Sequence, residues 1–529
     1  MMFVWCKHSG VRVMSNNKMG GGDSNRLALY AAKNMTVSGQ VLMRDYEDFD
    51  ILGVSCNALP QGVCFSYHYT ENITFHDGIP YPDILCNKET LHVKSHCTQG
   101  IWVHFCVGEN TPTGDYKQEL TVHTSGGDFK AFVCLKVYST VLPSVKDGAF
   151  SQEYFFSATE YFSYKDVRLS VADRLPNFYR FERYSDKWWT LMSDIAQKMK
   201  EIRANVFWLP TLELLCDAGS CRVSEKEWKL DFTLVDKMIE LFLSKGNFRH
   251  IVIKDHIVPN VGTAIRSIDE KGKMCTFPVF GEDAEAWADV FYPALYAHFK
   301  EKGWLSLLLM HLQDEPHNPQ YWQWARKKCR TYMPEIVCGE PLDMQSVAEQ
   351  MDGYFDWYIP RIDIYEPHAD FYKQCQSAGK TLWTYSCCYP EEHHWLNRFI
   401  DQPHVYIRQM MWACFSQGIT GYLHWGFNFW DSEILSGIQA GARFKGDGFI
   451  VYPDAEHGAL ALSARFVATR DGAQEYELLA LLAQKDESKA KEIAAKVAVN
   501  FTQFNTDENC VDEARKQILE LLEKETEQK

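Results

Sequence analysis

The spacing of hydrophobic residues divides the chain into parts of different character. Between about residues 25 and 142, apolar and polar residues alternate in short segments such as 101–107 and 129–138, which Gly, Pro and Asn interrupt. This alternation is typical of β-strands with one buried face. The sequence Ser125-Gly126-Gly127-Asp128 lies between two such segments and predicts a hairpin turn. We therefore expect an N-terminal antiparallel β-sandwich domain over residues 1–145.

Beyond this region the apolar spacing alternates between that of helices and that of short strands. Residues 185–202 place their apolar side chains on one stripe of a helix, and residues 205–209 form a compact apolar run. We expect further helices at 233–245, 284–302, 321–332, 369–377 and 405–417. We expect strands at 153–158, 205–209, 250–255, 305–313, 335–338, 354–359, 381–385 and 421–425.

The order of these elements predicts an α/β fold whose main part is a (β/α)8 TIM barrel over residues 146–457. Eight strands that alternate with helices over roughly 300 residues match the size and order of that fold. A doubly wound open sheet is the alternative, but no glycine-rich phosphate-binding loop follows any expected strand. From residue 458 the chain is rich in Ala, Leu, Lys and Glu, which predicts a C-terminal helical segment, 458–529, that packs on the barrel.

Composition excludes several classes of protein. A hydrophobic content of 46% is ample for buried cores, and no stretch is apolar enough and long enough to cross a bilayer. The net charge of −16 would repel phosphate backbones, so we expect neither nucleic acid nor a membrane as a partner. No secretory signal is visible at the N-terminus, and the seventeen scattered cysteines form no metal-binding spacing. We expect a cytoplasmic protein with reduced thiols, no metal and no cofactor.

The adjacent carboxyl residues Asp314 and Glu315 are the strongest candidates for chemistry. They follow the expected fourth strand, and barrel active sites are built at the carboxyl ends of the strands. Pro316 cannot donate a strand hydrogen bond, so pairing should stop there and leave both carboxyl groups at the rim. Glycoside hydrolases work with a pair of carboxyl groups. The competing interpretation is that the acidic pair only caps the helix that follows near residues 318–330.

The position of the two carboxyl groups indicates how they would divide the work. The expected seventh strand has no carboxylate before Glu391 and Glu392, which lie beyond it. Because chain neighbours cannot readily approach opposite faces of one sugar, Asp314 and Glu315 suit an acid–nucleophile pair poorly. In substrate-assisted hydrolysis, the carbonyl oxygen of the sugar's own 2-acetamido group attacks instead. One carboxylate then holds the amide nitrogen and the other serves as acid and base, which an adjacent pair can supply.

Aromatic and amide side chains cluster at the ends of the last two expected strands. Packing in the core is the alternative for each ring alone, but the clustering favours sugar binding at the same rim. The residues concerned are Trp383, Tyr385 and Tyr389 at strand seven, and Trp425, Asn428 and Trp430 after strand eight.

An ordered series of motifs over nearly the whole chain resembles glycoside hydrolase family 123, the β-N-acetylgalactosaminidases. The chain departs from the family pattern before Leu27, where it looks short. The motifs are Tyr81-Pro82-Asp83, Ile101-Trp102-Val103, Asp231-Phe232-Thr233, Asp314-Glu315-Pro316, and the segments 397–401, 418–426, 452–453 and 470–477.

The resemblance implies a retaining, exo-acting enzyme that releases terminal β-linked N-acetylgalactosamine through an oxazolinium intermediate. Asp314 would then orient the acetamido group and Glu315 would be the acid and then the base. Tyr385 would bind the acetamido carbonyl, and His256 and Gln313 would contact sugar hydroxyls. The partner would be an oligosaccharide or glycoconjugate that ends in β-N-acetylhexosamine. A glycoside hydrolase of other sugar specificity and a non-catalytic carbohydrate-binding protein are the alternatives.

Overall fold

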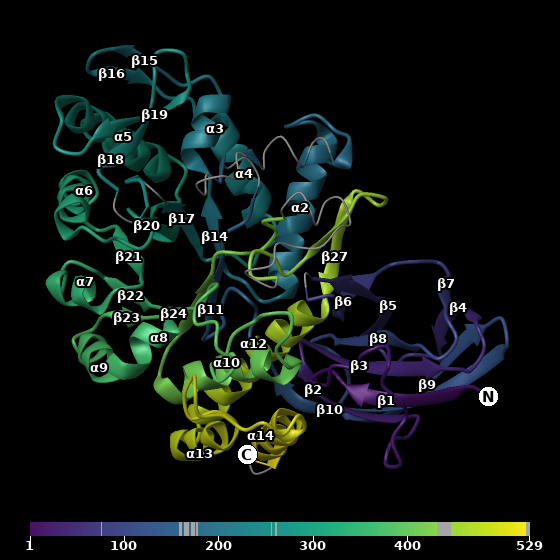
Figure 1. The fold of residues 1–529 in the computed structure, drawn as a ribbon. Helices are drawn as coiled ribbons and strands as arrows, with labels where there is room; N and C mark the ends of the chain where they lie inside the picture. The colour runs from purple at the N-terminus through teal and green to yellow at the C-terminus, as the bar shows by residue number, and fades with distance from the viewer. Residues whose placement is uncertain are drawn as a thin grey trace. The chain divides into compact units, whose positions relative to one another are not determined.

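The computed structural model describes residues 1–75, 77–157, 175, 178–254, 256–259, 262–430 and 446–524, and the backbone alone at 161–162 and 169–170. The chain divides into two compact units (Figure 1). The sandwich unit comprises Met1–Phe150, Glu391–Gly418 and Trp430–Lys529. The barrel unit comprises Ser151–Pro390 and Ile419–Phe429.

Two β-sheets form the larger part of the sandwich unit. Neighbouring strands are antiparallel except β2 and β10, which are parallel. The seven-stranded sheet has the order β1 (Phe3–His8), β3 (Met35–Arg44), β8 (Thr98–Val107), β5 (Val63–Thr74), β6 (Pro80–Cys86), β27 (Ala459–Ser463) and β26 (Tyr452–Asp454). The five-stranded sheet has the order β2 (Arg26–Lys33), β10 (Gly127–Val141), β9 (Gly114–Thr124), β4 (Phe49–Cys56) and β7 (Leu91–Val93).

The alternating pattern of the sequence accounts for these strands. In β10, Ala131, Val133 and Leu135 are fully buried at every second position, so one face of the strand lines the core. Gly127 lies opposite Thr124 in the ladder between β9 and β10, which confirms the predicted hairpin. The chain before Leu27 also carries a strand, because β1 pairs with β3 along its whole length.

Four helices complete the described part of the sandwich unit. They are α10 (His404–Gln417), α12 (Ala464–Ala483), α13 (Glu487–Val497) and α14 (Cys510–Lys524). A buried ion-pair network joins three of them, since Arg408 of α10 binds Glu475 of α12 and Asp512 of α14. The prediction of helix from residue 458 is wrong at its start, where β27 extends the seven-stranded sheet beside β6. The helix begins only after Ser463, whose side chain accepts from Phe466 N at 2.9 Å.

The barrel unit contains a nearly closed parallel barrel of nine strands. Its two edge strands, β23 and β24, are separated in sequence by Trp383 alone, so the expected strand 381–385 consists of two short pieces. Residues 305–307 form a 3-10 turn, so the expected fourth strand begins later than predicted. The strands are β11 (Ser151–Tyr154), β14 (Val206–Leu209), β17 (His250–Lys254), β20 (Leu308–His311), β21 (Val337–Leu342), β22 (Trp357–Pro360), β23 (Thr381–Leu382), β24 (Thr384–Tyr385) and β25 (Gly421–His424).

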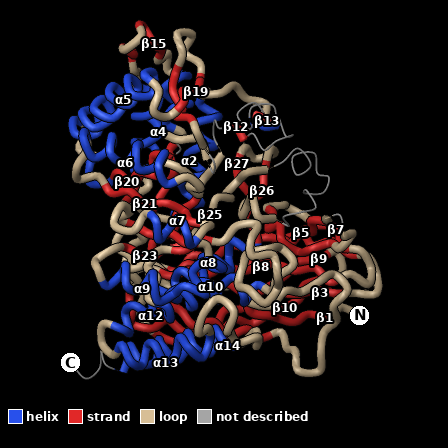
Figure 2. Tube along the Cα trace, turned by 60° about the vertical axis from the view of Figure 1, so that its left-hand side comes forward, coloured by secondary structure: helices blue, strands red, loops and turns tan. Residues whose placement is uncertain are grey.

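Helices lie outside the barrel strands (Figure 2). Ser185 caps α2 by accepting from Trp188 N, and the buried stripe of this helix is the predicted one. The helices are α2 (Asp186–Glu201), α3 (Thr211–Asp217), α4 (Thr233–Leu243), α5 (Glu282–Glu301), α6 (Pro319–Tyr332), α7 (Gln345–Gln350), α8 (Ile362–Tyr365) and α9 (Ala369–Ser377), with 3-10 turns η1 (Leu305–Leu307) and η2 (Glu366–His368). Three small antiparallel pairs are β12 (Tyr161–Phe162) with β13 (Leu169–Ser170), β15 (Cys221–Ser224) with β16 (Glu227–Lys229), and β18 (Ala264–Ile268) with β19 (Met274–Pro278).

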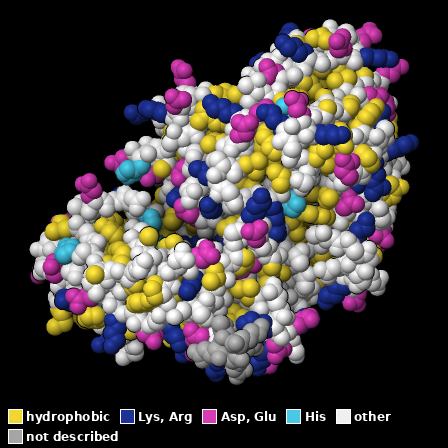
Figure 3. Space-filling view, turned by 180° about the vertical axis from the view of Figure 1, so that it is seen from behind, with side chains coloured by type: hydrophobic (Ala, Val, Ile, Leu, Met, Phe, Trp, Pro, Cys, Tyr) yellow, Lys and Arg dark blue, Asp and Glu magenta, His cyan; other side chains and the backbone are white. Residues whose placement is uncertain are grey.

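The structure also shows the distribution of surface charge, the character of the helices and the state of the cysteines. On the face shown in Figure 3, basic and acidic side chains lie interspersed. No helix within the described ranges has the length and apolar character needed to cross a membrane. All seventeen cysteines are free thiols.

Candidate active site

Asp314 and Glu315 lie in the turn that joins β20 to α6. Because β20 ends at His311, the two residues stand at the carboxyl end of a parallel barrel strand. Glu315 has a φ of 47°, a left-handed conformation that is uncommon for a residue with a side chain. The side chain of Asn318 caps α6 by accepting from Gln320 N at 3.2 Å. The acidic pair therefore does not cap the helix, and the competing interpretation of these two residues is wrong.

The carboxyl group of Glu315 is held beside the hydroxyl group of Tyr385. Tyr385 Oη donates to Glu315 Oε1 at 2.6 Å. Burial, followed by the negative charges of Asp314 and Asp343, raises the pKa of Glu315 to about 7. The hydrogen bond from Tyr385 and the charge of Arg361 act in the opposite direction. Glu315 can therefore be protonated near neutral pH, as a general acid must be.

Asp314 is paired with a buried cation. Lys254 Nζ lies 3.3 Å from Asp314 Oδ2, and the lysine side chain is only 6% exposed. The same ammonium group stands 4.3 Å from the ring centre of Phe155. The ion pair thus places a cation beside the Asp314 carboxyl group, directly next to Glu315 in the chain. Sequence reasoning missed Lys254, although it ends β17 just as His311 ends β20.

Two more charged residues at strand ends belong to this cluster. Asp343 follows β21, and its Oδ2 lies 3.1 Å from His317 Nε2. Arg361 follows β22, and its Nε and Nη2 donate to Asp363 at 2.7 and 3.0 Å. Asp343 and Arg361 both act electrostatically on Glu315. Only Arg361 had a signal in the sequence, because it follows the expected strand 354–359 closely, whereas Asp343 lies five residues beyond the expected strand 335–338 because β21 continues to Leu342.

Two of the predicted sugar-binding residues lie among these charged groups. Tyr385 is the hydrogen-bond donor described above. Tyr389 is 40% exposed, and the guanidinium carbon of Arg361 lies 5.6 Å from its ring centre. Trp425 is partly buried against the barrel core, 5.3 Å from the ring centre of Phe429. Tyr389 therefore offers an exposed ring on the same side of the site as Arg361.

Two other predicted residues hold the barrel together. Trp383 is 1% exposed and packs in the barrel core, with its ring centre 4.6 Å from that of Trp357. Asn428 is fully buried and binds both backbone groups of Ser157, at 2.7 Å to the nitrogen and 3.1 Å to the oxygen. The structure thus shows packing and bracing for these side chains, and contact with a sugar stays a prediction.

The remaining predicted residues are also buried. His256 is 2% exposed and stacks on Tyr292 with ring centres 5.2 Å apart. Gln313 is fully buried, and its Nε2 donates to Val258 O at 3.2 Å. Trp430 is 2% exposed and belongs to the sandwich unit. Their proposed contacts with sugar hydroxyls or sugar faces likewise stay predictions.

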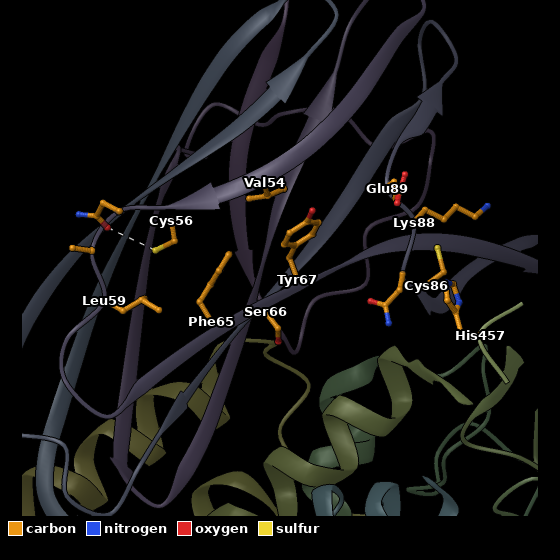
Figure 4. Close-up of a pocket in the computed structure, with 13 residues that line it drawn as sticks. Val54, Cys56, Leu59, Phe65, Ser66, Tyr67, Cys86, Lys88, Glu89 and His457 are labelled. Carbon is orange, nitrogen blue, oxygen red and sulfur yellow. Dashed lines mark hydrogen bonds between the residues drawn. The ribbon is translucent and has the colours of Figure 1, made fainter. Parts of the chain in front are cut away.

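No predicted site residue lines the cavity of about 730 Å³ in the sandwich unit (Figure 4). Its walls include Val54 and Cys56 from β4, Phe65 and Tyr67 from β5, and His457. Carboxyl groups are scarce there, so the cavity is not the candidate active site. In the described part of the chain, no group of three or more His, Cys, Asp or Glu side chains could hold a metal ion.

Comparison with known proteins identifies the family. The model of the glycoside hydrolase 123 catalytic domain matches residues 171–482. No curated protein sequence matches the chain. A β-glucuronidase from an uncultured Clostridium sp. matches over 83% of this chain and 66% of its own at 11% identity. Its TM-score of 0.34 is too low to indicate a shared fold.

One solved structure is similar over the whole chain. It is a family 123 glycoside hydrolase from Clostridium perfringens, studied for the hydrolysis of glycolipid glycans. The likeness covers 100% of this chain and 98% of that one, with a TM-score of 0.76 and 12% sequence identity, and at this identity it shows the fold. Because the family model covers more than half of the sequence, the chain is a glycoside hydrolase and belongs to glycoside hydrolase family 123.

Proposed function

We propose that the chain is a retaining, exo-acting β-N-acetylgalactosaminidase that uses the acetamido group of its substrate as the nucleophile. The observation that carries the proposal is the contrast between two adjacent carboxyl groups. Asp314 is paired with the Lys254 ammonium, whereas burial and neighbouring charges raise the pKa of Glu315 to about 7. One carboxylate and one carboxylic acid side by side are what substrate-assisted hydrolysis requires.

In the proposed mechanism, Glu315 first donates its proton to the glycosidic oxygen. The acetamido carbonyl oxygen attacks the anomeric carbon as the bond to the leaving group breaks, which gives an oxazolinium ion. Asp314 accepts a hydrogen bond from the acetamido nitrogen and stabilises the positive charge that develops there. Ionised Glu315 then takes a proton from water, and the oxygen of that water attacks the anomeric carbon as its bond to the acetamido oxygen breaks, which restores the acetamido group. Two inversions at one carbon retain the configuration.

Tyr385 would serve the proposed mechanism by changing its hydrogen-bond partner. Without substrate, its hydroxyl group donates to Glu315, a contact that lowers the pKa of the carboxyl group. When the acetamido carbonyl accepts this hydrogen bond instead, Glu315 loses a group that stabilises its ionised form. Substrate binding would therefore favour the protonated acid when the leaving oxygen needs its proton.

The proposal extends to the architecture and the cellular setting. We interpret β23 and β24 as one strand interrupted at Trp383, so that the barrel has the eight strand positions of a (β/α)8 TIM barrel over residues 146–457. The sandwich domain over 1–145 and the C-terminal segment over 458–529, helical from Ala464, would be the other two parts of the chain. The free cysteines suit a reducing compartment such as the cytoplasm.

A panel of chromogenic β-glycosides tests this function. The enzyme should cleave β-N-acetylgalactosaminides faster than β-N-acetylglucosaminides and should not cleave galactosides that lack the 2-acetamido group. Cleavage of plain galactosides at a comparable rate would refute the substrate-assisted mechanism and favour the alternative of another sugar specificity. Equal rates on both acetamido sugars would leave the mechanism standing but refute the proposed selectivity.

A further inference from the structure

Where β20 leaves the barrel sheet, the side chain of Glu340 accepts backbone hydrogen bonds that a strand carbonyl would otherwise accept. The ladder between β20 and β21 pairs Leu309 with Val337 and Met310 with Cys338. Continued in this register, it would bring Leu312 opposite Glu340. There, Glu340 Oε1 accepts from Leu312 N at 2.5 Å and from Gln313 N at 3.3 Å. These two amides belong to the residues directly before Asp314 and Glu315.

The same carboxyl oxygen also holds the helix that follows the acidic pair. Trp322 Nε1, on α6, donates to Glu340 Oε1 at 2.8 Å. The carbonyl oxygen of Leu312 is also bound, because Ile257 N donates to it at 2.9 Å. One oxygen atom therefore binds the backbone directly before the acidic pair and a side chain of the helix that follows it.

The carboxyl group of Glu340 lies in a fully buried polar cluster. Glu340 is fully buried, as are its neighbours His311 and Glu153. His311 Nδ1 lies 3.9 Å from Glu340 Oε2, and His311 Nε2 lies 3.5 Å from Glu153 Oε2. An apolar side chain at this position would leave the buried amides of Leu312 and Gln313 and the Trp322 indole without their acceptor. The carboxyl group therefore stabilises one conformation of the turn as well as filling space.

We propose that Glu340 is a positioning residue that fixes the turn between β20 and α6 and thereby holds Asp314 and Glu315 in their catalytic arrangement. The catalytic part of this inference rests on the proposed function. The left-handed conformation of Glu315 persists only where the surrounding structure enforces it. Since a displacement of about 1 Å can lower a rate about 100-fold, loss of these hydrogen bonds should act on turnover.

Hydrogen exchange tests the positioning without any substrate. In Glu340→Met, which keeps a long side chain but removes the acceptor, the segment 308–318 should exchange faster, because the amides of Leu312 and Gln313 lose their partner. Glu340→Gln keeps an acceptor oxygen and should protect the segment nearly as well as the parent. The matched control is Asp356→Asn. Asp356 Oδ2 accepts from Cys338 N at 3.0 Å, so the control alters a carboxylate bound to the amino-terminal half of β21.

Kinetics with a series of leaving groups give the catalytic readout. Glu340→Met should lower kcat about 100-fold or more on substrates with poor leaving groups and less on nitrophenyl glycosides, with little change in KM. Glu340→Gln should restore kcat to within about tenfold of the parent, because its oxygen still accepts from the turn. Asp356→Asn should change all substrates alike.

The outcomes separate this inference from the proposed function. Unchanged exchange over 308–318 in folded Glu340→Met, or the same kinetic change as in Asp356→Asn, would overturn the positioning role. If Glu340→Met does not fold, Trp322→Phe removes a single donor and should raise exchange in the same segment; unchanged exchange there would also overturn it. A parent enzyme that is inactive on acetamido sugars would refute the proposed function, whereas the exchange result would still decide the role of Glu340.

Discussion

Replacing Glu315 by Gln should make the folded chain more stable at alkaline pH. Burial and neighbouring carboxylates raise the pKa of Glu315 from 4.5 to about 7. The unfolded chain therefore loses this proton near pH 4.5 and the folded chain only near pH 7. The resulting destabilisation is absent below pH 4.5, grows between the two values and is complete above pH 7. Since one pKa unit corresponds to about 1.36 kcal/mol, its size is roughly 3 kcal/mol.

Thermal unfolding at two pH values measures this effect. At about pH 8, Glu315→Gln should have a Tm several degrees above that of the parent, since ~1 kcal/mol moves the Tm of a domain this size by ~2–4 °C. Near pH 4.5 the two proteins should unfold together, because both then carry a neutral side chain. The exposed Glu227 of β16 provides the control, and Glu227→Gln should behave like the parent at both values. Equal shifts in Tm at both pH values would refute the assignment of a raised pKa to Glu315.

The same substitution should impair catalysis in a way that depends on the leaving group. The amide side chain that Glu315→Gln introduces has no acidic proton to donate, so turnover should fall most on substrates whose leaving oxygen needs protonation. Nitrophenyl and fluoride aglycones depart without that proton and should suffer less. A uniform loss across the series would show that Glu315 is not the general acid.

Four further predictions concern the same site. Tyr385→Phe removes a donor that lowers the pKa of Glu315, so the alkaline limb of kcat/KM should move to higher pH and KM should rise for acetamido substrates; an unchanged limb would contradict the contact. Asp314→Asn should lower kcat about 100-fold or more with the circular dichroism spectrum unchanged, because a neutral amide cannot stabilise the charge on the acetamido nitrogen; near-parental turnover would exclude this role. A thiazoline mimic of the oxazolinium ion should inhibit the parent strongly in a competition assay, and failure to inhibit would favour direct attack by a carboxylate. Full activity should persist in a chelator, and a loss that a divalent ion restores would show that a metal is required.

Periodicity in the sequence was enough to locate the barrel strands and the acidic pair. Apolar runs with polar ends predict where parallel strands begin and stop, and a carboxyl pair directly after such a run stands at the rim. The pattern failed at residues 459–463, where a strand of the sandwich sheet precedes a helix. Its partner β6 lies more than 370 residues earlier in the chain, and no local pattern reports so distant a pairing.

Tyr385 was expected at the site, but Lys254 and the contact between Tyr385 and Glu315 were not predicted, because these contacts join separate strands. Lys254 meets Asp314 across 60 residues of sequence, and Tyr385 meets Glu315 across 70. The aromatic residues near strands seven and eight show the same limit. A ring at a strand end packs in the core or stands at the rim according to the side of the strand on which it lies. Trp383 and Tyr385 are two positions apart, yet the interruption at Trp383 separates two short strands with different neighbours.

The left-handed turn at Glu315 explains how two consecutive residues can do different work. Asp314 is directed to Lys254 on β17, the strand paired with β20 on one side. Glu315 is directed to Tyr385 on β24, the last strand of the sheet order, which does not pair with β20. The backbone of Glu315 is left-handed, and in this conformation one carboxyl group meets a cation and its neighbour meets a hydroxyl group in buried surroundings. Burial and the charges of Asp314 and Asp343 raise the pKa of Glu315, while the contact with Tyr385 lowers it and fixes the position of the carboxyl group.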